Sequence, residues 1–220
     1  MIAITRSISR LGNDISGLAL LEFAFILPIF LTMCLTGAEM TNYITTKMRV
    51  SQLALHLADN AARMGSGPRL AAKQINEGDI NDLFIGAQLQ SGELDLRSNG
   101  RVILSDLRPD DTNTGKFKIG WRRCYGLKTS YIRQYPTASG TANLAGIGPA
   151  ARQVTARPDN PTMFVELFYT YVPLVGRGTL APTTTFTEIA SMAVRDRRDL
   201  TGGPDENGIY TVNGVTPSTC

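Results

Sequence analysis

A long apolar stretch near the N-terminus constrains this chain more than any other feature. Residues Leu18 to Ala38 read LALLEFAFILPIFLTMCLTGA and carry a single charged side chain, Glu22. About 20 apolar residues, each rising 1.5 Å in a helix, cross the roughly 30 Å hydrocarbon core of a bilayer. A cleaved secretory signal has a shorter apolar region followed by a small-residue cleavage site. Because this stretch is longer and continues into a helical pattern, it predicts a retained transmembrane helix over residues 18–40.

A short polar leader, residues 1–17, precedes the apolar stretch and carries Arg6 and Arg10 against Asp14. Positively charged flanks favour the cytoplasmic side, although Lys47 and Arg49 flank the other end. The large remainder of the chain contains two cysteines that can pair, and disulfides belong to oxidising compartments. We therefore expect a single-pass protein with a cytoplasmic leader and an exported C-terminal domain, residues 65–220.

Glu22 needs a partner if the apolar stretch lies in a membrane. An acidic side chain at the centre of a membrane helix costs about 2.5–3.5 kcal/mol on insertion scales, and less near the interface. If the chain is cut after Gly17, the new amino group of Leu18 becomes a cation close to Glu22 of a neighbouring subunit. Such an ion pair would neutralise the carboxylate and fix the register between adjacent helices.

The residues around this acid resemble a known family. Gly17, four intervening residues and the pair Glu22-Phe23 are similar to the processing site of type IV pilin-like proteins of the tight-adherence class. The run EFAFILP, which ends at Pro28 and is followed by Gly37-Ala38-Glu39, resembles the opening motif of TadE-like minor pilins and pilus-assembly proteins.

The resemblance implies a pseudopilin-like subunit of the bacterial inner membrane with a periplasmic C-terminal domain. A prepilin peptidase would trim it between Gly17 and Leu18, and Glu22, Phe23 and Pro28 would serve assembly. The implied partners are other pilin-like subunits and the pilus assembly machinery of an adhesion and secretion system. A generic anchor helix with an isolated glutamate is the alternative interpretation of the same residues.

Residues 41–64 continue with a helical period. Apolar residues recur at spacings of three and four on one face, while His56, Asp59 and Arg63 fall on the polar face. Gly65 and Pro68 are expected to end the helix. The pattern predicts one helix from Leu18 to Met64; a membrane span plus a separate helix is the alternative. His56, the chain's one histidine, is expected to be solvated or to act as a cap.

The remaining sequence predicts an α+β fold: the long transmembrane and amphipathic helix followed by a mainly antiparallel β-sheet domain. Short helices are expected at Pro68–Ile75 and at Ile80–Leu89 with Asp79 as N-cap. Period-two patterns predict a hairpin turning at Asn99-Gly100, a strand at Phe117–Trp121, and an antiparallel pair at Met163–Val172 and Thr183–Val194 joined through Gly176, Gly178 and Pro182. Tyr125–Asn160 is expected to be a long irregular loop, with a short helix as the alternative.

Two further stretches add to the resemblance. The block from Val165 to Leu174 looks like a strand found in TadE-like outer domains, and Ala193–Leu200 resembles a segment of alphaproteobacterial members. The mixed charges of the second stretch, Arg195-Asp196-Arg197-Arg198-Asp199, are expected to be solvated. Of the three cysteines, Cys34 lies within the apolar stretch, so we expect a Cys124–Cys220 disulfide that ties the C-terminal tail to the strand carrying Trp121.

Nothing in the sequence points to catalysis. No nucleophile elbow, HExxH zinc motif, P-loop or dinucleotide fingerprint is present, and a Ser-His or Cys-His site would depend on the single histidine. The net charge of +3, with no run of basic residues interleaved with aromatics, argues against nucleic acid. We therefore expect no enzyme, cofactor, metal or small-molecule substrate. A membrane-anchored periplasmic binding or scaffold domain is the second hypothesis, and a membrane-tethered hydrolase is the third.

Overall fold

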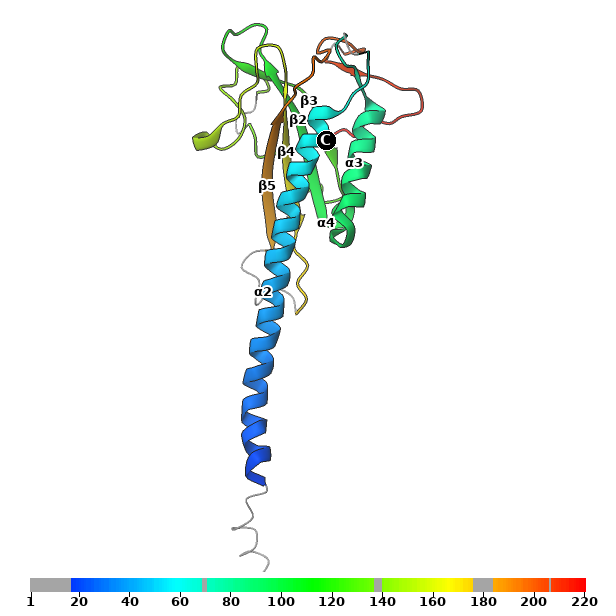
Figure 1. Cartoon of the computed structure of the whole chain (residues 1–220). Helices are drawn as coiled ribbons and strands as arrows, with labels where there is room; N and C mark the ends of the chain where they lie inside the picture. Colours follow the sequence, from blue (N-terminus) through cyan, green and yellow to red (C-terminus); the bar gives the residue numbers. More distant parts are fainter. Residues whose placement is uncertain (1–16, 69–70, 137–139, 176–183, 206) are drawn as a thin grey trace, which may run out of the picture. The chain divides into compact units, whose positions relative to one another are not determined.

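The computed structural model describes residues 17–68, 71–136, 140–175, 184–205 and 207–220. It has the predicted α+β fold, with one long N-terminal helix and a four-stranded antiparallel sheet (Figure 1). The chain divides into two compact units, residues 1–43 with 173–182, and residues 44–172 with 183–220. The predicted leader, apart from Gly17, and the predicted connection through Gly176, Gly178 and Pro182 lie outside the described residues.

Helix α2 (Leu18–Arg63) is continuous over 46 residues, which confirms the expectation of one helix rather than two. At 1.5 Å per residue it is about 70 Å long. It ends at Arg63, and Gly65 follows with a φ of +101°, a backbone conformation that glycine adopts without strain. The helix therefore belongs to the first unit up to Tyr43 and to the second unit from Ile44 onward.

The sheet of the second unit has the strand order β3-β2-β4-β5, and every neighbouring pair is antiparallel. All four strands overlap stretches that the sequence predicts to be strands, since the second arm of the predicted hairpin, at Val102 and Leu104, lies in the second strand of this order. In the third strand of this order, all side chains from Thr162 to Tyr169 are buried. Both faces of that strand are therefore covered, as its sequence pattern indicates. The strands are β2 (Gly100–Pro109), β3 (Phe117–Tyr125), β4 (Thr162–Thr170) and β5 (Thr185–Ala193).

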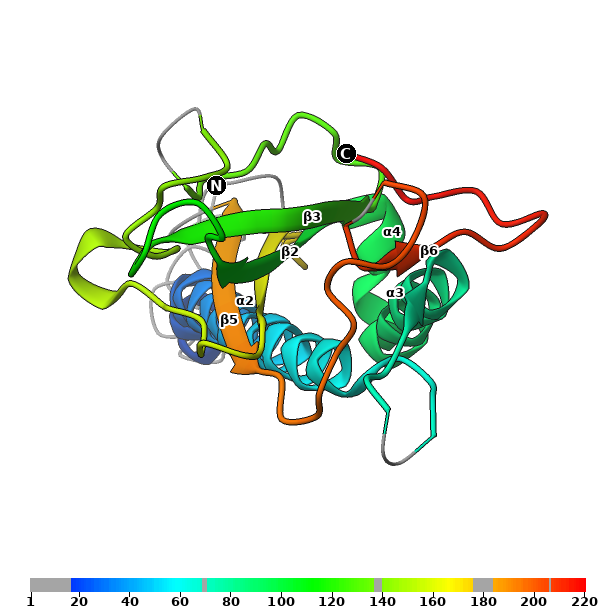
Figure 2. The ribbon, with the colours of Figure 1, turned by 90° about the horizontal axis from the view of Figure 1, so that it is seen from above.

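One face of the sheet packs against helices. The part of α2 from Ile44 onward and helix α3 (Glu77–Ser91) lie on the same side of the sheet in Figure 2. Val50, Leu57 and Ala61 of α2 are fully or almost fully buried. In α3, Phe84 stacks on Tyr125 of β3 with ring centroids 5.5 Å apart. This face holds the core that the period of residues 41–64 predicts.

The other face is covered by the long segment between β3 and β4. Leu144 and Ile147 pack against Leu107 and Phe164 of the sheet, and Tyr131 stacks on Phe168 with centroids 5.3 Å apart. Within its described part the segment has one short 3₁₀ turn, η3 (Ala150–Arg152), and no strand. The expected irregular loop is therefore a covering layer anchored by apolar side chains.

Two local predictions are wrong. Pro68–Ile75 forms no helix in its described part: Ser66 bridges to Gln74, and strand β1 (Ile75–Asn76) pairs in parallel with β6 (Ile209–Tyr210). Asn76, not Asp79, is the N-cap of α3. The Asn76 side chain accepts a hydrogen bond from the Asp79 amide, and the Asp79 carboxylate accepts one from the Asn76 amide.

The predicted hairpin turn at Asn99-Gly100 is also wrong, although the strand predicted to follow it is present as part of β2. Leu94 ends a 3₁₀ turn, η2 (Gly92–Leu94), and Asn99 ends a short helix, α4 (Leu96–Asn99), so the chain enters β2 from a helix. Asp95 adopts a left-handed backbone with a φ of 44°, and its side chain caps α4 by accepting from the Ser98 amide. A capped helical turn, not a two-residue hairpin turn, therefore precedes β2.

The Cys124–Cys220 disulfide is present and closes a sequence separation of 96 residues. The tail around it is also held by hydrogen bonds, because the Cys124 amide donates to the Ser218 carbonyl at 2.7 Å. Asn81 of α3 contacts the same tail through Thr216 and Ser218. The C-terminal segment is thus fixed to both β3 and α3.

Candidate functional site

The N-terminal half of α2 presents a large apolar surface. Leu20, Phe25, Ile29 and Met33 are each 65–75% exposed, and none of the most apolar window of the helix is buried in the protein. Within the described residues this is the one helix long and apolar enough to cross a membrane, by length and composition. Exposed apolar patches of this extent mark contacts with lipid or with other proteins.

The polar groups of this segment are largely satisfied within the helix. The hydroxyl of Thr32 donates to the Pro28 carbonyl at 2.7 Å, Thr36 donates to Thr32, and Thr41 donates to Gly37. Internal satisfaction is what a lipid environment requires, because it offers no water to buried donors. Sequence reasoning did not use these threonines, although their position inside an apolar helix signals such bonds.

Glu22 lies in the second turn of α2 and is exposed, as is Phe23 at 60%. Gly17 stands immediately before the helix, whose first residue is Leu18. Within the described residues, no cationic side chain lies within ion-pair distance of Glu22. The structure therefore gathers Gly17, Leu18, Glu22 and Phe23 in the first turns of one helix and places Pro28 further along it.

A second glutamate on α2, Glu39, has a different environment. Its side chain is 1% exposed, and its Oε2 accepts the amides of Leu174 and Val175 at 2.8 and 3.0 Å. This carboxylate ties the chain that follows β4 to the helix within the first unit. The sequence motif contains Glu39, but nothing in the local pattern indicates its partner, which lies 135 positions further along the chain.

Two buried arginines hold together parts of the second unit. Arg198 donates to the Met64 carbonyl at 2.8 Å and to the Ala61 and Ala62 carbonyls at 3.3–3.5 Å, so it caps the end of α2. Arg108 forms an ion pair with Asp106, and burial raises the pKa of that carboxyl. Burial also lowers the pKa of Arg198, since it disfavours the charged guanidinium.

The expectation that residues 195–199 form a solvated charged run is therefore only partly correct. Arg195 and Arg197 are exposed, and Asp196 pairs with Lys73 at 2.6 Å. Arg198, in contrast, is 6% exposed. The difference arises because the Arg198 side chain satisfies helix-terminal carbonyls that have no partner within α2.

No catalytic constellation gathers in the described residues. His56 is exposed, as predicted, and its Nδ1 lies 2.7 Å from the Gln90 amide nitrogen. Asp59 pairs with Arg63 on the same helix. In the part of the chain that the structure describes, no three His, Cys, Asp or Glu side chains are arranged to hold a metal ion.

Comparison with known proteins adds no family to this geometry. No protein-family model, no curated protein and no solved structure matches the chain.

Proposed function

We propose that this chain is a minor pilin-like subunit of a tight-adherence type pilus, anchored in the bacterial inner membrane with its leader in the cytoplasm and its outer domain in the periplasm. The observation that carries the proposal is the continuous helix α2, apolar and exposed at one end and packed under a sheet at the other. A helix of this kind can leave the membrane and pack among equivalent helices while its domain stays folded.

The position of Glu22 supports a role in assembly rather than in anchoring alone. The carboxylate is exposed on an apolar helix and has no cationic partner within the described residues. After cleavage between Gly17 and Leu18 by a prepilin peptidase, the amino group of Leu18 in an adjacent subunit supplies that partner. The function is structural, and the proposal assigns no enzymatic activity, cofactor or small-molecule substrate.

The alternative is a membrane-anchored periplasmic scaffold that never enters a fibre. Its supporting observation is the domain of residues 65–220, in which a disulfide fixes the C-terminal tail and both faces of the sheet are covered by the same chain. Crosslinking separates the two functions: adducts with subunits of sheared pili support the pilin-like role, whereas adducts confined to inner-membrane proteins support the scaffold.

The variant Glu22→Ala tests the role of the acid. We expect it to insert into the membrane in normal amounts, because it removes a charge from an apolar helix, but to abolish pilus assembly. Cys34→Ala is the matched control, since Cys34 is exposed in the same segment and carries no partner role in the proposal. Normal piliation in Glu22→Ala would reject the charge-pairing function.

A further inference from the structure

Strand β5 forms an open edge of the sheet. Among the described strands it pairs with β4 alone, in regular register. The Tyr171 amide donates to the Thr184 carbonyl and the Val194 amide donates to the Pro161 carbonyl. These two bonds show which residues of β5 form hydrogen-bonded pairs with β4, because such pairs alternate along an antiparallel ladder. The backbone N–H and C=O groups of Thr187, Ile189 and Ser191 therefore point away from β4.

The opposite edge of the sheet is occupied. Phe117 of β3 exchanges hydrogen bonds with Leu144, and the Ile119 amide donates to Thr141. Further along β3, the Cys124 amide donates to Ser218. Within the described residues no comparable segment covers β5, so the two edges differ.

Strand β5 also lacks the usual protection of an exposed edge. Its sequence, TFTEIASMA, contains no proline, no lysine and a single charged residue, Glu188. Natural edges are commonly blocked by proline, charge or a bulge, because an open edge templates the addition of another strand. Nine unprotected residues are long enough for a full added strand.

Apolar surface lies on one side of this edge. On the face away from the helices, a groove is lined by Val154, Phe164 and Ile189. On the helix side, the hollow that Met192 of β5 helps to line is mostly charged, with residues of both signs.

Exposed apolar side chains lie further along α2. Met48 and Leu55 precede Ala62, which lines this hollow, at intervals of seven residues, so the three lie in one row of the helix. The first two are 57% and 52% exposed. On one face the side chains of an added strand would thus meet the apolar groove, and on the helix side they would meet charged groups near Met192 and apolar groups near Met48 and Leu55.

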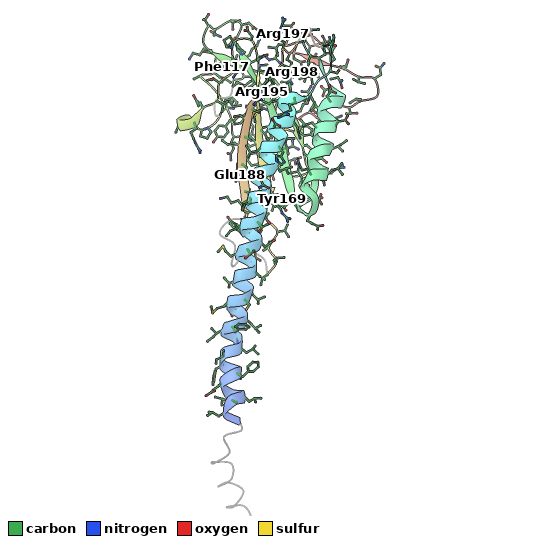
Figure 3. The ribbon with its side chains drawn as sticks, viewed as in Figure 1. Phe117, Tyr169, Glu188, Arg195, Arg197 and Arg198 are labelled. Atoms are coloured by element: carbon green, nitrogen blue, oxygen red, sulfur yellow. A yellow bond between two sulfur atoms is a disulfide. The ribbon has the colours of Figure 1, made fainter. Side chains whose placement is uncertain are left out.

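Acidic and basic side chains lie at different points along this edge. Glu188 lies within β5 and Arg195 lies beyond its far end, and the two are separated along the strand in Figure 3. Arg152, which lines the outer groove beside Ser191, has the same charge as Arg195. Within the described residues neither arginine takes part in an ion pair. An incoming strand is therefore favoured if it places an acidic residue beside these two cations.

A second copy of this chain is a poor occupant. Symmetric pairing of two β5 edges is antiparallel, and it reverses the direction of α2 in the second copy. Two chains whose α2 helices enter the same membrane, as the proposed function requires, cannot pair in this way. The other edge of a second copy, β3, is already covered by residues around Leu144 and Ser218.

We propose that the open edge of β5 binds an extended segment of a different protein subunit by strand addition. The segment carries apolar side chains on the face that meets the groove of Val154, Phe164 and Ile189, and an acidic residue at the end that lies beside Arg152 and Arg195. Main-chain hydrogen bonds to Thr187, Ile189 and Ser191 supply affinity, and the flanking surfaces supply specificity.

The test is site-specific photocrosslinking of the full-length chain in the cells that produce it. Benzoylphenylalanine replaces Thr187, which is exposed at the edge, and the adduct is mapped by mass spectrometry. We expect crosslinking to an acidic, apolar segment of another subunit. Adducts with a second copy of the chain, or no adduct, would overturn the proposal.

Backbone and charge variants identify the binding mode. Ile189→Pro removes an outward N–H without removing a hydrogen bond to β4, so we expect adduct yield to fall more than about tenfold. Ile189→Val keeps that N–H and should leave the yield unchanged. Arg195→Glu, a change at an exposed side chain, should lower it about threefold or more. Unchanged yield in both Ile189→Pro and Arg195→Glu contradicts strand addition.

The same sample separates this inference from the proposed function. Intact mass reports whether the chain is cut between Gly17 and Leu18. If the chain that carries benzoylphenylalanine at position 187 and no other change is correctly cut but gives no adduct, the edge proposal alone is refuted. An adduct formed by an uncut chain refutes the pilin-like function alone.

Discussion

Replacement of Glu39 provides a quantitative test of the contact near the outer end of the apolar segment. The carboxylate is 1% exposed and accepts two backbone amides, those of Leu174 and Val175, at 2.8 and 3.0 Å. Hydrogen bonds to a charged group contribute about 1.5–3 kcal/mol each. The Leu174 side chain is 66% exposed, so water can replace part of what Glu39→Ala removes. We therefore expect local opening of this segment to become easier by about 2 kcal/mol, or roughly 30-fold in equilibrium constant.

Amide hydrogen exchange measures this opening directly. The full-length chain in detergent micelles is compared with Glu39→Ala and Glu39→Gln, and exchange is followed in peptides that contain Leu174 and Val175. Glu39→Ala should speed exchange of these two amides about 30-fold, and Glu39→Gln, which keeps an acceptor oxygen, should have a smaller effect. The central strand β4 should keep its protection in both variants. Unchanged exchange at Leu174 and Val175 in Glu39→Ala would refute the assigned role of the carboxylate.

Two further predictions concern the outer domain. Replacing both Cys124 and Cys220 with serine should lower the free energy of unfolding by about 2–4 kcal/mol, because the disulfide closes a long loop. Urea titration monitored by Trp121 fluorescence measures this difference. Equal stability of the unmodified chain and the double variant would contradict the prediction. Burial raises the pKa of Glu166, so the folded state binds more protons than the unfolded one, whose glutamate has a pKa of about 4.3. The free energy of unfolding should therefore fall as pH rises from about 4 through that raised pKa. Glu166→Gln should remove this contribution to the pH dependence of stability. An identical pH dependence in urea titrations of both proteins would show that Glu166 is not responsible.

Regular periodicity made the main elements predictable. The helix from Leu18 to Arg63 follows from an apolar run joined to a helical repeat, and β3, β4 and β5 follow from alternation. The disulfide was predictable because the third cysteine lies in the apolar segment. For the helix and the strands, the signal is carried by neighbouring residues in the sequence.

Several errors lie where distant partners decide the structure, whereas those at the N-cap of α3 and at the turn before β2 are local. Ile75–Asn76 forms a strand because Ile209–Tyr210 lies beside it, and no local pattern indicates that pairing. Arg198 is buried because it caps α2, although its neighbours in the sequence are exposed charges. The buried role of Glu39 and the open edge of β5 depend in the same way on tertiary contacts that the sequence alone does not specify.

The most direct test of the pilin-like assignment is the intact mass of the chain extracted from membranes of cells with an active prepilin peptidase. Cleavage between Gly17 and Leu18 creates the amino group that the proposal pairs with Glu22 of an adjacent subunit. We expect a mature chain that begins at Leu18. A membrane-extracted chain that still begins at Met1 would contradict it.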